Sequence, residues 1–404
     1  MLNTATIKEY AYELGFDTAR ISSAEAFPEA ERVIKERIAQ GLMDGLPWFT
    51  AERADVSCHP DALLPDARSI ISLAMFYLTE QPDDENAGTD NAATQGPRGR
   101  ISRYAWGDDY HEVIKPKLQQ FALWLRQYAH GEINSELETR LFVDTGRMVD
   151  RAVAQRAGLG WYGKNTNILT KGWGSWVFLA EIVTNLPLAA DTPTRANCGS
   201  CEICLHACPT QAFPAPYVLD NTRCISYLTI ELRGSIPIEL RPLMGNLIFG
   251  CDICQQVCPV NKVVEKRLGF RKEAGEAGQL LQVRRREEFR PRAGIGSNPE
   301  LIPLLSLTEE QFRERFRSSP IRRTKRRGLL RNVCVALGNS GDPLAVPALV
   351  NALSDYEPLV RGHAAWALGR IGGDQAKHAL DDVLASEDDE EVKKEIRYAL
   401  QMKK

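Results

Sequence analysis

The spacing of apolar residues predicts a region of mixed strands and helices, followed by a region of helices alone. Near the N-terminus apolar side chains recur at helical spacing from Ile7 to Leu14, so residues 1 to about 50 are expected to be helical. Residues 69–77 are almost continuously apolar and predict a buried strand. Residues 81–100 are rich in Asp, Asn, Gly and Thr, and this composition predicts a loop.

Strands and helices are expected to alternate in the next part of the chain. Strands are predicted at residues 140–144 and 176–183, and helices at residues 111–129 and 148–157. Strands interleaved with helices are typical of an α/β domain. We expect this domain to span residues 1–190.

The last eighty residues repeat. Residues 331–338 return in similar form as residues 361–369, and residues 392–400 begin a third copy. Each copy starts with a helix of small residues that is followed by Leu-Gly. A second, apolar helix comes next, at residues 345–353 in the first copy and 376–384 in the second. This period predicts stacked helical pairs of the HEAT type over residues 326–404. His363 and His378 fall within the pattern and are expected to be structural.

Composition describes an ordinary globular enzyme with accessory parts. The 404 residues predict two to three domains, and 44% hydrophobic content is enough to form real cores. No apolar stretch approaches the roughly 20 residues that a membrane crossing requires. The chain begins without the charged, apolar and small-residue segments of a secretory signal, so a cytoplasmic location is expected.

A local run of basic residues says more about possible binding partners than the net charge of -3 does. Residues 266–325 are predicted to form a basic linker with helices. The basic run begins in this linker and extends into the first repeat. It consists of Arg313, Arg315, Arg317, Arg322, Arg323, Lys325, Arg326, Arg327 and Arg331. A charge run is often only a solvated face. Because this run lies beside the extended surface of a solenoid, the more specific alternative is that it binds the phosphates of a nucleic acid.

Eight of the ten cysteines lie between residues 198 and 258, within a predicted two-cluster ferredoxin-like module at residues 191–265. In two-cluster ferredoxins three closely spaced thiolates bind one cluster, and the cysteine before a proline binds the other. That rule assigns Cys198, Cys201, Cys204 and Cys258 to one 4Fe-4S cluster. The second cluster receives Cys208, Cys224, Cys251 and Cys254, with Cys224 replacing a cysteine that the second run lacks.

Two other uses of these cysteines are less consistent with the spacing. Structural zinc sites need only two Cys-x-x-Cys pairs and do not use a further cysteine three residues later. Disulfides do not persist in a reducing cytoplasm. The remaining cysteines, Cys58 and Cys334, are expected in a loop and in a core, respectively.

Residues 158–165, Gly-Leu-Gly-Trp-Tyr-Gly-Lys-Asn, resemble two nucleotide-binding motifs without satisfying either. The dinucleotide fingerprint must follow a strand, whereas this segment follows a predicted helix. A P-loop needs Ser or Thr where Asn165 stands. The three glycines still indicate backbone that passes close to a bulky neighbour.

Several motifs together resemble the epoxyqueuosine reductase family. They lie at residues 103–105, 109–111, 144–146, 157–165, 174–176, 224–231 and 250–255. With the repeats, the chain resembles the longer form of the family, which carries a C-terminal HEAT-like domain. The resemblance implies a reductive-dehalogenase-like α/β catalytic domain and reduction of epoxyqueuosine to queuosine at the wobble position of tRNA anticodons.

The resemblance also implies a cofactor and a catalytic acid. Electrons would pass through the two clusters to cobalamin, and Asp144 would donate a proton to the departing oxygen. The alternative role for Asp144 is an N-cap of the helix expected at Met148. No histidine stands in the context that supplies a cobalt ligand, so cobalamin is expected without a protein imidazole. Residues expected to border the cofactor are Asp144, Gly158, Gly160, Lys164, Asn165, Ser226, Cys251 and Asp252.

The implied partners are a tRNA with a queuosine-type anticodon and an unidentified low-potential electron donor, with no membrane and a monomeric enzyme. The residues expected to contact RNA are Arg233, Arg322, Arg323, Arg326 and Arg327. Two other functions compete with this one. A reductive dehalogenase-like protein has no use for the basic run and the repeats. An iron-sulfur electron carrier on a HEAT adaptor leaves the N-terminal domain and Asp144 without a role.

Overall fold

The computed structural model describes residues 3–79, 96–131, 136–269, 286–292 and 295–402. The loop predicted at residues 81–100 lies mostly outside these described residues. The chain forms two compact units, each built from segments distant in sequence. The first unit combines Met1–Thr79, Asp109–Thr222 and Ile253–Phe289, and the second combines Glu80–Asp108, Arg223–Asp252 and Arg290–Lys404. The four consecutive domains expected from the sequence remain a prediction.

A four-stranded sheet is the centre of the first unit. Its strand order is β1 (Thr18–Ser23), β2 (Ser69–Phe76), β7 (Val177–Thr184), β4 (Thr139–Phe142), and every neighbouring pair is antiparallel. All eight residues of β2 are buried, which explains why its sequence shows no alternation of apolar and polar residues. The predictions of β2, β4 and β7 are confirmed within two residues. Strand β1 falls in a segment that the sequence predicted as helix.

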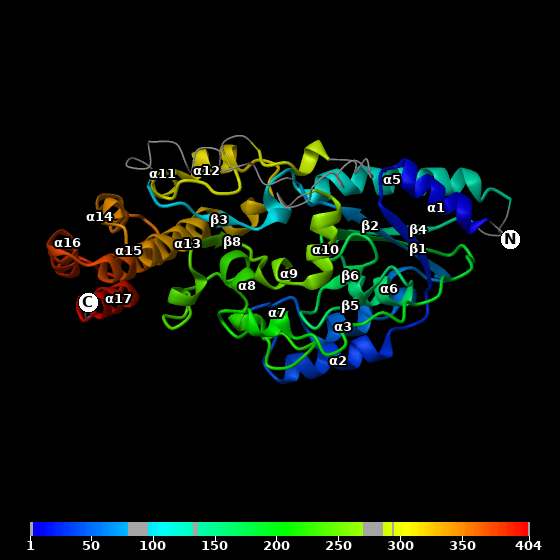
Figure 1. Cartoon of the computed structure of the whole chain (residues 1–404), viewed down its shortest axis with the longest axis horizontal. Coiled ribbons are helices and arrows are strands. Elements are labelled where there is room, and N and C mark those ends of the chain that lie inside the picture. Colours follow the sequence, from blue (N-terminus) through cyan, green and yellow to red (C-terminus); the bar gives the residue numbers. More distant parts are fainter. Residues whose placement is uncertain (1–2, 80–95, 132–135, 270–285, 293–294, 403–404) are drawn as a thin grey trace. The chain divides into compact units, whose positions relative to one another are not determined.

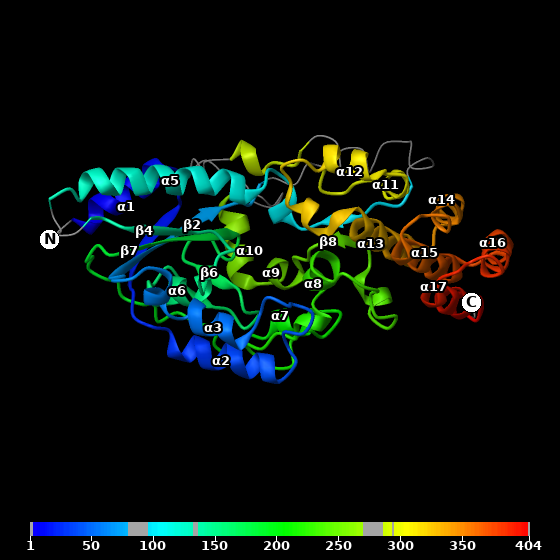
Figure 2. The same ribbon diagram turned by 180° about the vertical axis from the view of Figure 1, so that it is seen from behind.

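Helices cover both faces of this sheet (Figure 1). Helices α1 (Thr4–Glu13) and α5 (Tyr110–Tyr128) lie on one side, and α6 (Asp150–Arg156) lies on the other, as the reverse view in Figure 2 also shows. On the α6 side, Ile70 and Val183 of the sheet form a core cluster with Val153. Cys58 is fully buried in the same cluster and lies in the turn that follows the helix ending at Ser57, so its predicted loop position is confirmed.

The remaining elements of the first unit surround the sheet, and six of the eight clustered cysteines lie in or next to them. They are α2 (Pro28–Ala39), α3 (Ala51–Ser57), α4 (Pro60–Leu63), β5 (Gly160–Tyr162), β6 (Ile168–Thr170), α7 (Ile203–His206), α9 (Ile253–Gln256), α10 (Pro259–Arg267) and the short helix Glu287–Phe289, with the short helix Asn221–Arg223 where the two units meet in sequence. Strands β5 and β6 pair as an antiparallel hairpin.

The second unit contains a parallel pair of short strands and the helices of the repeats. Its elements are β3 (Arg100–Ile101), Arg103–Ala105, α8 (Ile225–Ile230), Arg241–Met244, β8 (Leu247–Phe249), α11 (Ile302–Leu305), α12 (Glu309–Arg315), Pro320–Thr324, α13 (Lys325–Ser340), Pro343–Ala345, α14 (Val346–Ala352), α15 (Pro358–Ile371), α16 (Asp374–Leu384) and α17 (Glu390–Leu400). None of the described helices in either unit is long and apolar enough to cross a membrane.

Glycines set the spacing between successive repeat helices. A Cβ on Gly338 of α13 would lie 2.9 Å from Cα of Ala367 in α15, and a Cβ on Gly369 of α15 would lie 2.7 Å from Cβ of Ala399 in α17. The predicted Leu-Gly pair therefore lies inside each helix, and its glycine is where the next helix packs. The helical repeats and the core position of Cys334 are confirmed. His363 is fully buried, in accord with the predicted structural role, whereas His378 is exposed.

Candidate active site

Asp144 lies in the loop that follows β4. Its side chain is exposed, and its backbone has a φ of 52°, in the left-handed region that Asp and Asn tolerate better than most residues. The hydroxyl of Tyr110, at the start of α5, donates a hydrogen bond to Oδ2 of Asp144. The loop therefore presents a carboxyl group that is accessible and oriented by a tyrosine.

Two further contacts define the surroundings of this carboxyl. The ring of Tyr110 stacks on Phe178 of β7 with centroids 4.3 Å apart, which fixes the hydroxyl relative to the sheet. Nη2 of Arg53 donates a hydrogen bond of 2.7 Å to the carbonyl of Gly146, and so holds the loop itself. Arg53 was not predicted from the sequence, because nothing near it resembles a motif.

The alternative role of Asp144 as a helix N-cap is wrong. Helix α6 begins at Asp150, its N-cap position is Val149, and no side chain caps it. The residues between Asp144 and Asp150 form a loop, so the carboxyl of Asp144 lies too early in the chain for this role.

A buried carboxyl pair lies on the α6 side of the sheet. Glu181 of β7 is fully buried and Asp150 of α6 is half-buried. Burial raises the pKa of Asp150 to about 6 and raises the pKa of Glu181 well above its usual value. The negative charge of Asp144 acts in the same direction on both groups, which shows that the three carboxyls interact.

Electrostatic interactions connect the first predicted set of four cysteines. Cys198, Cys201, Cys204 and Cys258 all belong to the first unit. Burial and, to a smaller extent, the charges of Cys258, Cys198 and Cys201 raise the pKa of the Cys204 thiol to about 11. A bound iron ion would stabilise such thiols as thiolates, which is the form in which cysteine binds a cluster.

The second set is divided between the units: Cys208 and Cys254 belong to the first unit, and Cys224 and Cys251 to the second. In the first unit the backbone N–H of Ala212 donates to Sγ of Cys208 at 3.4 Å, and Nδ2 of Asn167 donates to Sγ of Cys254 at 3.9 Å. Such N–H groups tune cluster potentials. Asn167 was not singled out in the sequence, although it follows the motif at residues 157–165.

In the second unit, Cys224 is the N-cap residue of α8, and Cys251 follows β8 after Gly250. Both cysteines are half-buried and stand at the end of a regular element. Their positions are therefore set by α8 and β8.

The segment 158–165 packs tightly within the first unit. A Cβ on Gly158, which has a φ of 72°, would lie 2.2 Å from the carbonyl oxygen of Thr192, and a Cβ on Gly160 would lie 2.5 Å from that of Leu169. These glycines are therefore required by the packing of the protein's own backbone.

The polar residues of this segment are turned toward the cysteine region. Nζ of Lys164 forms an ion pair of 3.2 Å with Glu202, which lies between Cys201 and Cys204. Nδ2 of Asn165 donates a hydrogen bond of 3.3 Å to the carbonyl of Cys254. Both side chains are buried, so they support the cysteine-bearing loops directly.

Asp252 and Ser226 lie in the second unit. Asp252 is buried, and its carboxylate accepts hydrogen bonds from Oγ of Ser102 at 2.5 Å and from the backbone N–H of Arg103 at 2.8 Å. Ser226 is half-buried, and its carbonyl accepts a hydrogen bond from Thr229. Asp252 thus fixes the segment before η1, the 3-10 helix Arg103–Ala105.

The arginines expected to bind RNA differ in accessibility. Arg322 is exposed, while Arg323 forms an ion pair with Glu231 and keeps 41% of its side chain exposed. Arg233 is equally exposed and donates to the carbonyl of Arg323 at 2.9 Å. Arg327 lies 3.9 Å from Glu357 and is partly exposed.

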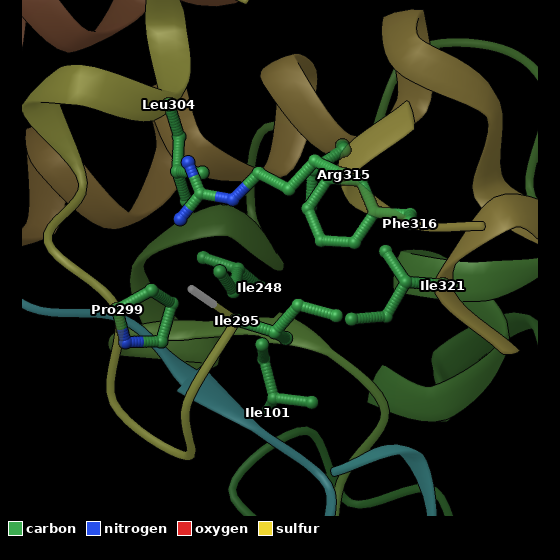
Figure 3. Close-up of a pocket in the computed structure, with 9 residues that line it drawn as sticks. Ile101, Ile248, Ile295, Pro299, Leu304, Arg315, Phe316 and Ile321 are labelled. Atoms are coloured by element: carbon green, nitrogen blue, oxygen red, sulfur yellow. The ribbon is translucent and has the colours of Figure 1, made fainter. Parts of the chain in front are cut away.

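Arg326 is buried, and its guanidinium is used inside the protein. It forms an ion pair of 2.5 Å with Asp355 and donates to the carbonyl of Leu307. Arg331 is also fully buried. Figure 3 shows Arg315 beside Leu304 and Phe316 at an apolar cavity of the second unit, where burial lowers its pKa. Part of the basic run therefore stabilises the second unit and does not form a free cationic surface.

Family models match three parts of the chain. Residues 58–145 match epoxyqueuosine reductase QueG, residues 197–261 match the 4Fe-4S double cluster binding domain, and residues 322–401 match HEAT repeats. The first match ends just after Asp144, and the second contains all eight clustered cysteines. The chain therefore carries a double 4Fe-4S cluster binding domain followed by HEAT repeats, as the sequence predicted.

Similar proteins extend over nearly the whole chain. An epoxyqueuosine reductase of Bacillus subtilis (strain 168) is 35% identical over 398 residues, covering 98% of this chain and 95% of the relative. One of Escherichia coli (strain K12) is 36% identical over 364 residues, covering 90% and 88%. A crystal structure of epoxyqueuosine reductase with a tRNA-Tyr epoxyqueuosine-modified stem loop has a TM-score of 0.86 and 34% identity, covering 99% of this chain and 98% of that chain. The chain belongs to the epoxyqueuosine reductase family.

Proposed function

We propose that this protein reduces the epoxide of epoxyqueuosine at the wobble position of tRNA to give queuosine, and releases the epoxide oxygen as water. The observation that carries the proposal is the exposed carboxyl of Asp144 in the loop after β4, which accepts a hydrogen bond from the hydroxyl of Tyr110. Breaking a carbon-oxygen bond by reduction requires a proton for the oxygen, and a positioned carboxylic acid can supply it. Family membership identifies the substrate on which this acid would act.

Electrons would reach the site through two 4Fe-4S clusters. We assign Cys198, Cys201, Cys204 and Cys258 to one cluster, and Cys208, Cys224, Cys251 and Cys254 to the other. Support for the first set is the mutual electrostatic interaction of its thiols. Support for the second set is the N–H groups directed at Cys208 and Cys254. A low-potential donor must reduce the clusters from outside.

Cobalamin would be the reducing cofactor, and when bound it supplies a strongly reducing cobalt centre. One buried polar atom supports this assignment: the indole N–H of Trp161 has no hydrogen-bond acceptor among the described residues. The amide groups at the edge of a corrin could accept from it. We propose that Asp144, the backbone of the segment from Gly158 and Gly160 to Lys164 and Asn165, and Ser226, Cys251 and Asp252 border the cofactor, and that no protein imidazole binds its cobalt.

RNA binding would use the accessible arginines of the second unit. These are Arg233, Arg322, Arg323 and Arg327, whose side chains are at least partly exposed. Arg326 would act indirectly, by holding the start of α13 through Asp355. We propose that the protein acts as a monomer in the cytoplasm, on tRNA with a queuosine-type anticodon.

The direct experiment is conversion of a synthetic anticodon stem-loop that contains epoxyqueuosine. The chain would be reconstituted anaerobically with iron and sulfide, loaded with cobalamin, reduced chemically, and mixed with the RNA. Digestion and mass spectrometry should then detect queuosine, and iron analysis should give about eight irons per chain, as two 4Fe-4S clusters require. Product that forms equally well without cobalamin would refute the cofactor assignment, and absence of product from fully loaded enzyme would refute the function.

A further inference from the structure

The proposed reaction consumes two protons, whereas one carboxyl group can donate only one at a time. An epoxide holds one oxygen bonded to two carbons, and two electrons with two protons convert it into a carbon-carbon double bond and water. One proton binds the oxygen as the first carbon-oxygen bond breaks. The other converts the resulting hydroxyl into water as the second bond breaks. If Asp144 donates both, it must regain a proton within the turnover.

Glu181 has the surroundings of a group that stores a proton. It is fully buried in β7, and neither of its carboxyl oxygens accepts a hydrogen bond from an N–H group in the part of the chain that the structure describes. Its carboxyl faces that of Asp150. An ionised carboxylate in such a place would be very unfavourable, so a proton must be shared by the pair.

The pair lies near the end of β4, from which the loop that carries Asp144 continues. In the sheet, Glu181 stands opposite Phe142 of β4 on one side and opposite Ser72 of β2 on the other. Directly opposed residues of antiparallel strands point to the same face, and here that is the face covered by α6. Asp144 follows two residues after Phe142, so its loop begins beside Glu181.

Few other charged or titratable groups act on the pair. The negative charge of Asp144 favours the protonated forms of both Asp150 and Glu181, while the positive charge of Arg151 favours ionisation of Asp150. Tyr162 interacts with Asp150, and burial raises the pKa of this tyrosine to about 12, so it stays neutral. Burial raises the pKa of both carboxyls, in accord with a stored proton at neutral pH.

We propose that Asp150 and Glu181 form a proton-storing pair that reprotonates Asp144 during turnover. The proton moves from the pair to the carboxylate of Asp144, and from there to the substrate oxygen. An opened epoxide oxygen is far more basic than a carboxylate, so the transfer from pair to oxygen is favourable overall. Water then returns a proton to the pair. This inference rests on the proposed function, and the two residues act through Asp144.

The decisive variant is Glu181→Gln, because glutamine has the shape of a protonated glutamate and cannot release the proton. The matched control is Ser72→Ala, which alters the neighbouring position on β2 without removing an acid. Ser72 suits this purpose because its buried hydroxyl has no partner among the described residues. Infrared spectra near neutral pH should show a band of protonated carboxylic acid that Glu181→Gln loses and Ser72→Ala keeps. A band unchanged by Glu181→Gln would overturn the proposal.

Single-turnover reduction of the stem-loop by pre-reduced holoenzyme tests whether the stored proton is used. We expect Glu181→Gln to slow product formation by about 10-fold to 100-fold, with a steeper loss at high pH and partial recovery in a concentrated weak-acid buffer. Ser72→Ala should react like the native enzyme. Native rates and pH dependence in Glu181→Gln, with the infrared band lost, would overturn the relay. Inactivity of the native holoenzyme would instead refute the proposed function.

Discussion

The backbone of Asp144 determines which substitution can test its chemistry. A φ of 52° is uncommon for residues other than glycine, and Asp and Asn adopt it more readily than Ala. Alanine at this position would therefore change the loop as well as the acid. Asparagine retains the loop and removes only the proton, so it is the informative replacement.

A buried carboxyl with a raised pKa makes stability depend on pH. Folded Glu181 binds its proton more tightly than the unfolded chain does, so its contribution is fully present below pH of about 4.3 and is lost as the pH rises toward the folded-state pKa. Glutamine has no such dependence. We predict that Glu181→Gln becomes more stable relative to the native chain as the pH rises from 5 to 8, measured as a difference in Tm.

This prediction has a simple control. Ser72→Ala changes the opposite residue in β2 without a titratable group, so its Tm difference from the native chain should stay constant over the same pH range. A constant difference for Glu181→Gln as well would show that Glu181 titrates normally in the folded protein.

These two residues also show the limit of sequence analysis. Asp144 could be identified because it stands in a family motif at residues 144–146. Glu181 lies within a strand that was predicted correctly, yet its partner Asp150 is far away in sequence. Only the antiparallel pairing and the position of α6 bring the two carboxyls together, and no local pattern encodes that contact.

At the scale of elements, the repeats were the most predictable part of the chain. Each repeat helix packs on the next one, so the same small residues recur at the same positions and leave a visible period. The sequence could not show that Gly338 and Gly369 lie inside the helices. Their role depends on the neighbouring helix, where Ala367 and Ala399 leave no space for a Cβ.

Two glycines of α15 provide a matched test of this packing. In Gly369→Ala the new Cβ would lie 2.8 Å from the carbonyl oxygen of Ala399, and we predict a loss of about 1–3 kcal/mol of stability. In Gly362→Ala it would meet the flexible side chain of Glu395 at 3.4 Å, so the better helix propensity of alanine should leave stability equal or higher. Thermal unfolding measures both, and equal Tm values for the two variants would contradict the close packing.

Helix α13 also holds the segments that carry Cys224 and Cys251. Arg331 donates to the carbonyls of Leu228, Leu232 and Gly234, all within 2.8 Å, and so fixes the end of α8. Asn332 donates to the carbonyls of Thr229 and Ile248, at 2.8 and 2.9 Å, and links α8 to β8. The first repeat helix therefore fixes the segments next to two proposed cluster ligands, in addition to the RNA-binding role that its charges suggested.

Replacement of Arg331 should affect both stability and iron binding. Arg331→Met leaves three carbonyls without their donor, and we predict a loss of about 2–5 kcal/mol. Cys224 and Cys251 should then be poorly placed, so the iron content should fall from about eight toward about four per chain. Arg322→Met removes an exposed arginine and should change neither value. Native Tm and iron content in Arg331→Met would contradict this role of α13.

At the scale of the whole molecule, charge should govern RNA binding. We predict that the combined change of Arg322, Arg323 and Arg327 to Ala raises KM for tRNA much more than it lowers kcat, because these partly exposed side chains can reach phosphate. The slope of log affinity against log salt should fall by about 0.7–0.9 for each lost phosphate contact. Arg326 stays unchanged, because its ion pair with Asp355 is structural.

A control for net charge comes from α2. Changing Arg32, Lys35 and Arg37 to Ala removes the same number of positive charges from the first unit. Binding and salt slope should then stay close to native values. Equal effects of the two triple variants on RNA binding would mean that only net charge matters. If neither variant changes RNA binding, the basic run is only a solvated surface.

The order of domains along the chain was predictable only in part. Cysteine spacing and the repeat period identified two modules, because both are local patterns. The compact units instead combine distant segments, as when β3 at Arg100–Ile101 pairs with β8 at Leu247–Phe249. Such parallel pairing of short strands has no local signal, so a linear division could not anticipate it.

The central claim is that Asp144 is the proton donor in reduction of epoxyqueuosine, and Asp144→Asn tests it most directly. Native and variant holoenzymes would be matched for iron and cobalamin content, reduced, and mixed with epoxyqueuosine stem-loop for a single turnover. We predict that the variant binds both cofactors and the RNA normally but forms queuosine about 100-fold to 10,000-fold more slowly. Queuosine formation at the native rate by Asp144→Asn would contradict the account.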